Sequence, residues 1–249
     1  MHYGHHVGVG ANVWECCHIL VVTWGTCTVL CLVSPTVGGG SLDDFLEALG
    51  SGAPTPGGGS ASALAGALAA ALAEMVASLS QGNRQDPASR EFMSSAVAQL
   101  RDFRVQLRAA MRDDERAFQQ VMLAYRMVGD TDEHRAARTE AIQLALVHAA
   151  EPPMTIMQLV AQMLPLIRDV ARDGNVQVIS DAGCAAYMAI AAARSARLNV
   201  LANVVLLKDE QIAGHLREES NKLEHASQDL SEEIVAVVHS RMQRGGSHA

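Results

Sequence analysis

One carboxylate in this sequence falls in a series of positions that otherwise carry apolar side chains. The series has the 3-4 spacing of the buried face of a helix, and it contains Leu100, Phe103, Leu107, Met111, Asp114, Phe118, Val121 and Tyr125. Burying a charge is costly, so Asp114 needs a partner, a raised pKa or a ligand. A partly buried carboxyl can move protons, whereas an ion pair with an arginine of the 135–138 stretch would explain the same pattern. Asp113, about 100° round the helix, is predicted to face water.

A second helix carries polar side chains on its predicted inward face. Asp181, Asn199 and Asn203 recur among small apolar residues in a helix expected from Asn175 to about Leu207. A hydrogen-bonded polar layer between helices is the alternative interpretation. Together with the carboxylate of the first helix, this face predicts a pocket between two helices.

A glycine-rich loop supplies the third group of candidate residues. Pro56, Gly57, Gly58, Gly59 and Ser60 combine a stiff proline, three residues without side chains and a predicted helix N-terminus. The free N–H groups at such an end favour anionic or carbonyl oxygens. The spacing matches neither G-x-x-x-x-G-K-[ST] nor G-x-G-x-x-G, so nucleotide binding is not supported. The alternative is a tight turn that lets the alanine-rich helix after it pack closely.

Helices must position all of these residues. Caps, periodicity, glycines and prolines predict a loop over 50–59 and helices over residues 41–49, 60–80, 87–128, 131–150, 152–173 and 176–207, followed by a final helix that contains Ile212 and Val238. Pro152 and Pro153 are predicted to start a new helix, because proline lacks the N–H group that a helix interior needs. We expect an all-α fold, a single-domain antiparallel bundle of long helices.

Composition supports an all-helical core and excludes one class of partner. Of the 249 residues, 49% are hydrophobic and only 4% aromatic, so the core must be built from Ala, Leu, Val and Met, most of which are good helix formers. The net charge is −8 and no Lys or Arg precedes Arg84, so the basic stripe of a duplex-DNA binder is missing. Few aromatic rings are available to stack bases. We therefore expect no nucleic-acid partner.

Residues 1–40 differ from the rest and are predicted to be a non-domain N-terminal extension. They hold four of the five cysteines, so no disulfide framework spans the chain, and a reducing, cytoplasmic compartment fits best. The apolar stretch 16–33 lacks a basic flank and is short for a membrane span, so membrane association is not expected. Adjacent Cys16 and Cys17 do not match zinc-ligand spacing, so no metal site is predicted. The helical domain is expected over 41–242, followed by a flexible tail, 243–249.

Four segments, in this order and spacing, resemble the cyclodeaminase/cyclohydrolase family of folate enzymes: PTPGGGSASALAGALAAALAEMVASLS, DDERAFQQVMLAY, GNVQVISDAG and LNVLAN. The resemblance covers about residues 41–242. It implies an all-helical homodimer that acts on a one-carbon unit carried by tetrahydrofolate and needs no metal or redox cofactor. It places the proton-transferring aspartate at Asp114. The substrate-binding residues that it implies, with the pocket interpretation above, are Pro56, Gly57, Gly58, Gly59, Ser60, Arg84, Asn175, Ser180, Asp181, Asn199 and Asn203.

The resemblance leaves the reaction open between two chemistries. GNVQVISDAG is nearer to the stand-alone cyclohydrolases, which favours hydrolysis of 5,10-methenyltetrahydrofolate to 10-formyltetrahydrofolate. The alternatives are a formimidoyltetrahydrofolate cyclodeaminase that releases ammonia, and a catalytically inactive folate-binding or scaffold dimer. Two departures bear on the last alternative. The basic run after the alanine-rich helix is reduced to Arg84, and Val205 stands where relatives often have lysine.

Overall fold

The computed structural model describes residues 21–24, 27–30, 41–82 and 86–246. The chain divides into two compact units, 1–39 and 40–249. In the first unit, β1 (Val21–Trp24) and β2 (Cys27–Leu30) form an antiparallel hairpin with Val21 opposite Leu30. The sequence predicted an all-α protein, so this hairpin departs from the prediction. Their valine and threonine side chains favour extended backbone.

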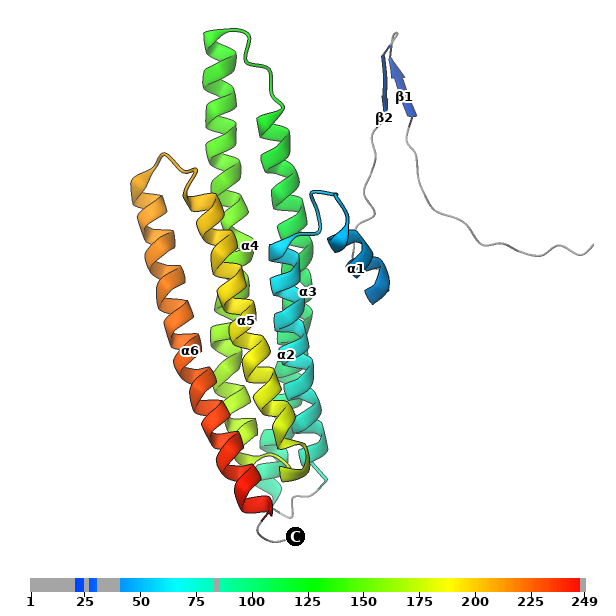
Figure 1. The fold of residues 1–249 in the computed structure, drawn as a ribbon, viewed down its shortest axis with the longest axis vertical. Helices are drawn as coiled ribbons and strands as arrows, with labels where there is room; N and C mark the ends of the chain where they lie inside the picture. The colour runs from blue at the N-terminus through cyan, green and yellow to red at the C-terminus, as the bar shows by residue number, and fades with distance from the viewer. Residues whose placement is uncertain (1–20, 25–26, 31–40, 83–85, 247–249) are drawn as a thin grey trace, which may run out of the picture. The chain divides into compact units, whose positions relative to one another are not determined.

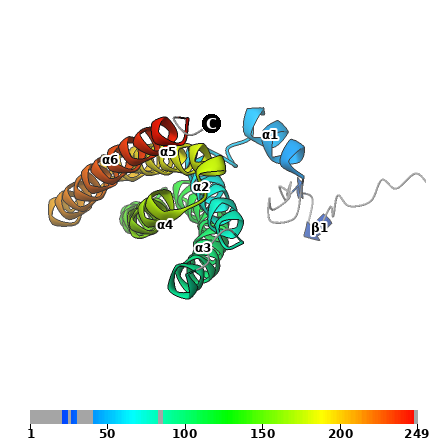
Figure 2. The same cartoon turned by 90° about the horizontal axis from the view of Figure 1, so that it is seen from below.

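The second unit is a helical domain of six α-helices: α1 (Leu42–Gly50), α2 (Gly58–Ser80), α3 (Pro87–Tyr125), α4 (Asp132–Asp173), α5 (Ile179–Val204) and α6 (Glu210–Gly246). A single 3-10 turn, η1 (Val176–Val178), precedes α5. The five long helices run alternately up and down the bundle (Figure 1). Seen along the bundle, α6, α5, α2 and α3 form an arc, and α4 packs on its inner side against all four (Figure 2). The predicted all-helical single domain is confirmed.

Side-chain caps set the starts of several helices. At α1, Ser41 Oγ accepts from the N–H of Asp44 at 3.2 Å, and the Asp44 carboxylate accepts from the N–H of Ser41 at 2.7 Å. Thr131 Oγ1 accepts from the N–H of His134 at the start of α4. Each of these bonds satisfies an N–H group that the helix itself leaves free. The starts near Ser41 and Thr131 follow the sequence, whereas α2 begins at Gly58, two residues before its predicted start.

The predicted boundary between helices at Pro152 and Pro153 is wrong. α4 is one continuous helix of 42 residues that contains Pro152, Pro153 and Pro165. A proline inside a helix leaves the carbonyl four residues earlier without its backbone donor. For Pro153 that carbonyl belongs to Ala149, and the side chain of Asn203 on α5 donates to it at 3.0 Å. A neighbouring helix thus replaces a missing bond, which a single-helix pattern cannot reveal.

Small side chains allow the central helices to pack closely. α2 and α5 bury many alanines along their contact. Half of the largest fully buried side chains lie on α4: Leu146, Ile156, Met157, Met163, Leu164 and Ile167. At the outer edge of the arc, Arg197 on α5 pairs with Glu224 on α6 at 3.0 Å. The Ala-rich pattern therefore makes a close-packed centre, and charged side chains join the outermost helix to it.

Two helical stretches are long and apolar enough to cross a membrane by composition, Gly58–Ser80 and Val176–Val204. Half of the apolar window of each is buried within the bundle. At the other end of the domain, α6 continues to Gly246. The first four residues of the predicted flexible tail, 243–246, are therefore helical, and residues 247–249 lie outside the described part of the chain.

Candidate active site

A cavity of about 270 Å³ lies where the loop before α2 and the first turn of α2 meet α3, α4 and α5. Its lining is Pro54, Thr55, Gly57, Gly58, Gly59, Asp114, Phe118, Ala149, Asn199, Ala202 and Asn203. Three groups of residues that lie far apart in the sequence therefore line one cavity: the glycines 57–59, the carboxylate of Asp114 on α3, and the carboxamides of Asn199 and Asn203 on α5. The cavity holds one titratable side chain, that of Asp114.

Asp114 lies directly against the first turn of α2. Ser60 Oγ donates a hydrogen bond to Asp114 Oδ2 at 3.1 Å, and the backbone of Ser60 also hydrogen-bonds to the carboxylate. A Cβ added to Gly59 would lie 2.0 Å from Asp114 Oδ1, a separation that real Cβ atoms do not show. Gly59 is therefore required by space, because the carboxylate occupies the place where a side chain would be. The positive end of the α2 dipole faces this carboxylate.

Burial raises the pKa of Asp114 above that of an ordinary aspartate. Desolvation is the largest cause, and the side-chain and backbone hydrogen bonds from Ser60 oppose it by stabilising the ionised form. The net direction is upward, so the carboxyl holds a proton more readily than an exposed aspartate does. This shift brings its proton affinity nearer to neutral pH, which favours a group that must both accept and donate a proton.

Asn199 and Asn203 form the α5 wall of the cavity. Asn199 Nδ2 donates to the carbonyl of Ser195 at 2.8 Å, and its amide group lies 3.2 to 3.3 Å from the Cβ position of Gly58. Asn203 Nδ2 donates to the carbonyls of Ala149 and Asn199, each at 3.0 Å. Both side chains are thus held by backbone carbonyls. Gly58 leaves room for one of them.

The ion-pair alternative for Asp114 is not what the structure shows. Arg135 hydrogen-bonds to Asp132 and to the carbonyl of Gly129, and Arg138 donates to the carbonyl of Tyr125 at 2.7 Å. These arginines therefore stabilise the turn between α3 and α4. Asp113 is half-exposed and pairs with Arg116 on its own helix, as expected of a side chain that faces water.

Asn175, Ser180 and Asp181, which were also predicted to bind substrate, lie away from this cavity. Asn175 caps η1, accepting from the N–H of Gln177 at 3.0 Å, and its own N–H donates to Ser80 Oγ at 2.8 Å. Ser180 and Asp181 follow in the first turn of α5, and 18 residues of helix separate Asp181 from Asn199, about 27 Å at the usual rise. The predicted pocket thus contains Asn199 and Asn203 without Asp181. Pro56 is buried beside the cavity, its bond to Thr55 is cis, and Arg84 lies outside the described residues.

Two features of the site region were missed by sequence reasoning. Ala149 forms the α4 wall, and its carbonyl is available to Asn203 because of Pro153. The signal in the sequence was the pair Pro152 and Pro153. It was interpreted as a helix boundary, although Pro153 within a continuous helix leaves the carbonyl oxygen of Ala149 free to accept a hydrogen bond. Glu115 is 7% exposed, more buried than Asp114, and its position four residues after Met111 could have marked it as inward-facing.

The arrangement can exchange a proton with a ligand and hold it by hydrogen bonds. Among the described residues of the helical domain, no three His, Cys, Asp or Glu side chains are grouped so that they could hold a metal ion. A carboxyl of raised pKa, two oriented carboxamides and the N-terminus of a helix together suit acid–base chemistry on a polar group carried by an organic ligand.

The chain is similar to known proteins in both sequence and structure. Residues 41–222 match the model of the formiminotransferase-cyclodeaminase family. The chain is 37% identical over 205 residues to the methenyltetrahydrofolate cyclohydrolase of Methylorubrum extorquens, covering 82% of this chain and 99% of that protein. It is 32% identical over 170 residues to the formimidoyltransferase-cyclodeaminase of Rattus norvegicus, covering 68% of this chain and 31% of that longer protein. The crystal structure of formiminotetrahydrofolate cyclodeaminase from Thermotoga maritima superposes with a TM-score of 0.72 at 27% identity, covering 80% of this chain and 96% of that one. The chain therefore belongs to the formiminotransferase-cyclodeaminase family.

Proposed function

We propose that this protein is a folate one-carbon enzyme that hydrolyses 5,10-methenyltetrahydrofolate to 10-formyltetrahydrofolate. Support comes from the Methylorubrum cyclohydrolase, which is matched over 99% of its length. The observation that carries the proposal is the position of Asp114. Its carboxyl lines the cavity, is desolvated, and is held by Ser60 at the start of α2.

In the first step of the proposed reaction, Asp114 acts as a general base. The substrate carbon is bonded to N5 and N10 and shares their positive charge. Water adds to that carbon while the ionised carboxylate takes one of its protons, which gives a neutral tetrahedral centre. The negative charge of Asp114 also stabilises the cationic substrate beside it, so the same side chain favours binding and attack.

In the second step the protonated carboxyl acts as a general acid. Its proton goes to N5 as the bond from carbon to N5 breaks, and the hydroxyl on carbon loses its proton as the formyl group forms on N10. One water molecule is consumed and one proton is released to solvent, which balances the loss of the positive charge of the substrate. A carboxyl with a raised pKa can perform both transfers, each of which contributes about 10²- to 10⁴-fold to an enzymatic rate.

A cyclodeaminase reaction is the second candidate. The observation that favours it is the likeness to the Thermotoga cyclodeaminase, which extends over 96% of that chain. In this reaction N10 attacks the formimino carbon and ammonia leaves. Asp114 would remove the proton from N10 and deliver a proton to the departing nitrogen. Both reactions therefore use the same carboxyl, and they differ in the atom that attacks and the atom that leaves.

Parallel assays of the purified full chain separate these candidates. We expect loss of methenyl absorbance with formation of 10-formyltetrahydrofolate, faster than in the Asp114→Asn variant. Ammonia release from formiminotetrahydrofolate with no hydrolysis above that variant would replace the cyclohydrolase with the cyclodeaminase. Folate binding without turnover of either substrate would identify an inactive binding protein and end the enzymatic proposal.

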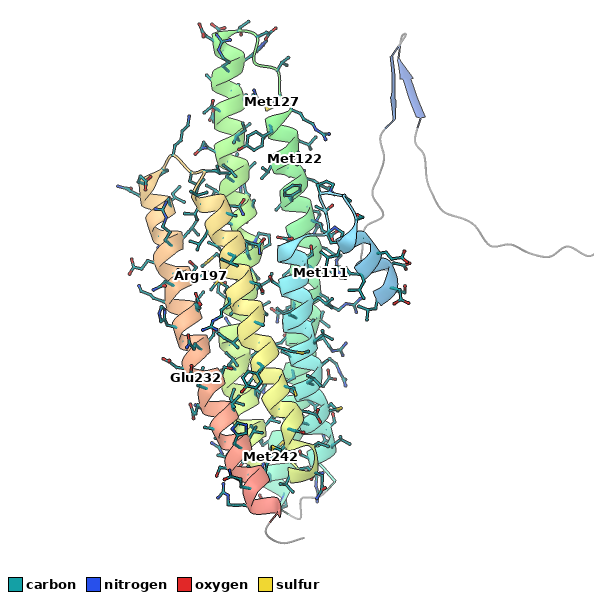
Figure 3. All side chains as sticks on the ribbon, in the orientation of Figure 1. Met111, Met122, Met127, Arg197, Glu232 and Met242 are labelled. Carbon is teal, nitrogen blue, oxygen red and sulfur yellow. The ribbon has the colours of Figure 1, made fainter. Side chains whose placement is uncertain are left out.

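We further propose that the functional unit is a homodimer. Leu68, Met75 and Leu79 lie on one face of α2 and are 39–49% exposed, although they are large and apolar. The hairpin of α3 and α4 extends beyond α2 and carries the labelled Met122 and Met127 (Figure 3). Apolar surface of this extent is best buried against a second copy of the chain. That contact would also cover the exposed side of α2, which is apolar enough by composition to cross a membrane.

Sedimentation equilibrium tests the dimer. We expect a dimer at micromolar concentration, and we expect Leu79→Asp to shift the protein to monomer because it places a charge within the buried face. Leu42→Asp alters an exposed leucine on α1 and should leave the dimer intact. A wild-type monomer at these concentrations would contradict the proposal.

A further inference from the structure

We propose that Asn203 is a positioning residue that holds the α4 wall of the cavity through the carbonyl that Pro153 leaves free, and that it presents only its carboxamide oxygen to the substrate. The effect on catalysis rests on the proposed function. The structural half of the proposal does not, because it concerns bonds that exist without a ligand.

The bond from Asn203 joins the two helices at a point where α4 lacks a backbone donor. In a regular helix the N–H of residue 153 would donate to the carbonyl of Ala149. Pro153 has no N–H, so the carbonyl of Ala149, a residue only 7% exposed, lacks its usual backbone donor. Asn203 Nδ2 lies 3.0 Å from the Ala149 oxygen and supplies the bond from α5. A lone buried acceptor is thereby satisfied across a helix–helix contact.

The same bonds determine which atom of Asn203 faces a ligand. Its Nδ2 carries two hydrogens, and the two carbonyls of Ala149 and Asn199 each accept at 3.0 Å. Turning the amide over would place its oxygen against both carbonyl oxygens, so the orientation is unambiguous. Both donors are therefore occupied. The remaining polar atom, Oδ1, can only accept a hydrogen bond.

The cavity consequently selects for a donor on the ligand at this wall. Asn203 and Ala149 both line the cavity, so the bond between them also sets the distance between its α4 and α5 sides. An N–H group of the substrate facing Oδ1 would be bound, whereas a bare carbonyl or ring nitrogen would meet a repulsive oxygen. Asn203 thus acts on reaction geometry through Ala149 and on substrate binding through Oδ1.

A double-mutant cycle tests the structural half without any folate. Asn203→Ala should lower the ratio of folded to unfolded protein about 10-fold, the effect of leaving one buried acceptor unsatisfied. In a Pro153→Ala background the restored N–H can donate to Ala149, so the same substitution should lower the ratio only about 3-fold or less. Pro165→Ala restores an N–H elsewhere in α4 and is the matched control. An equal effect of Asn203→Ala in all three backgrounds would overturn the proposal.

Turnover by the same variants tests the effect on catalysis. Asn203→Ala should lower kcat by about 10-fold and raise KM. Adding Pro153→Ala should restore most of kcat, whereas KM should stay raised because the acceptor oxygen of Asn203 is absent from both variants. Adding Pro165→Ala should restore neither. If Pro153→Ala restores nothing, the positioning role is refuted. If it restores KM as well, the assignment of Oδ1 as a ligand is refuted. A wild-type chain without turnover would refute the proposed function and leave the stability cycle as the test of the Asn203–Ala149 bond.

Discussion

Replacing Gly59 with alanine changes one methyl group and tests the geometry of the whole site. The added Cβ would lie 2.0 Å from Asp114 Oδ1, 2.4 Å from Cγ and 2.5 Å from Oδ2. Contacts below 3.0 Å are essentially absent for real Cβ atoms, so the carboxyl must move by at least about 1 Å. Its hydrogen bond to Ser60 Oγ is already 3.1 Å long and cannot survive such a shift in the direction away from α2.

The size of the effect on the rate follows from this displacement. A misplacement of about 1 Å in a catalytic group can cost about 10²-fold in rate, so we expect kcat of Gly59→Ala to fall by about that factor. The expected effect on KM is smaller, since the carboxamides of Asn199 and Asn203 keep their backbone partners. The loss should therefore lie mainly in the chemical step.

The assay is initial-rate hydrolysis of methenyltetrahydrofolate, with two other glycines as controls. Alanine at Gly58 would place a Cβ 3.2 Å from Asn199 Oδ1, a tight contact that a small side-chain movement relieves, so we expect an intermediate loss. Alanine at Gly52 meets nothing within 4 Å and should leave kcat unchanged. Circular dichroism and thermal unfolding verify that each variant is folded.

The relative kcat losses of the three glycine variants test whether the position of Asp114 limits the reaction. A folded Gly59→Ala enzyme within about threefold of wild-type kcat would show that the position of Asp114 does not limit the reaction, since the carboxyl must have moved. Equal losses at Gly59 and Gly52 would point to a general effect on the loop. Either result would refute the proposed geometric requirement.

Three other predictions follow from the site and the domain boundary. Asp114→Asn should lower turnover at least about 10²-fold while folate binding survives, and Asp113→Asn should cost far less; equal losses would assign Asp114 a structural role. Folding raises the pKa of Asp114, so ionisation of this carboxyl lowers the free energy of unfolding as the pH rises from about 3.9 through the folded pKa. Asp114→Asn removes this ionisation, so the variant should unfold at a higher temperature than wild type at pH 7, and the difference should vanish near pH 3. A chain that begins at Ser41 should keep the fold, assembly and activity of the full chain, as thermal unfolding and the same assays would show.

Much of the fold was accessible from the sequence because its signals are local. Ser41 and Thr131 mark helix starts through hydrogen bonds within four residues, and glycines and polar turns mark most helix ends. The prediction failed at Pro152 and Pro153, where the deciding interaction comes from Asn203, about 50 residues away in sequence. A proline reports the loss of a local donor, and the sequence does not show whether another helix replaces it.

The candidate site divides in the same way. Periodicity identified Asp114, Asn199 and Asn203 as inward-facing, and the structure places all three on one cavity. The same periodicity grouped Asp181 with them, because a helix face has the same pattern along its whole length. The position of each side chain along the axis of α5 decides whether it reaches the cavity at the start of α2. This position depends on how α5 packs against α2, which the periodicity of one helix does not show. Whether Asp181 and Asn175 bind substrate stays a prediction.

The environment of Asp114 is a balance between two opposed effects. Burial alone would favour the neutral acid, which could donate a proton but would be a poor base for water. A helix N-terminus and two bonds from Ser60 alone would favour the carboxylate, which could accept a proton but would hold it too weakly to protonate a ring nitrogen. The proposed reaction requires both states in succession. Ser60→Ala removes one bond and should raise the pKa of Asp114 further, moving the acid limb of the pH–rate profile to higher pH; a limb that moves to lower pH would mean that Ser60 does not stabilise the ionised carboxyl.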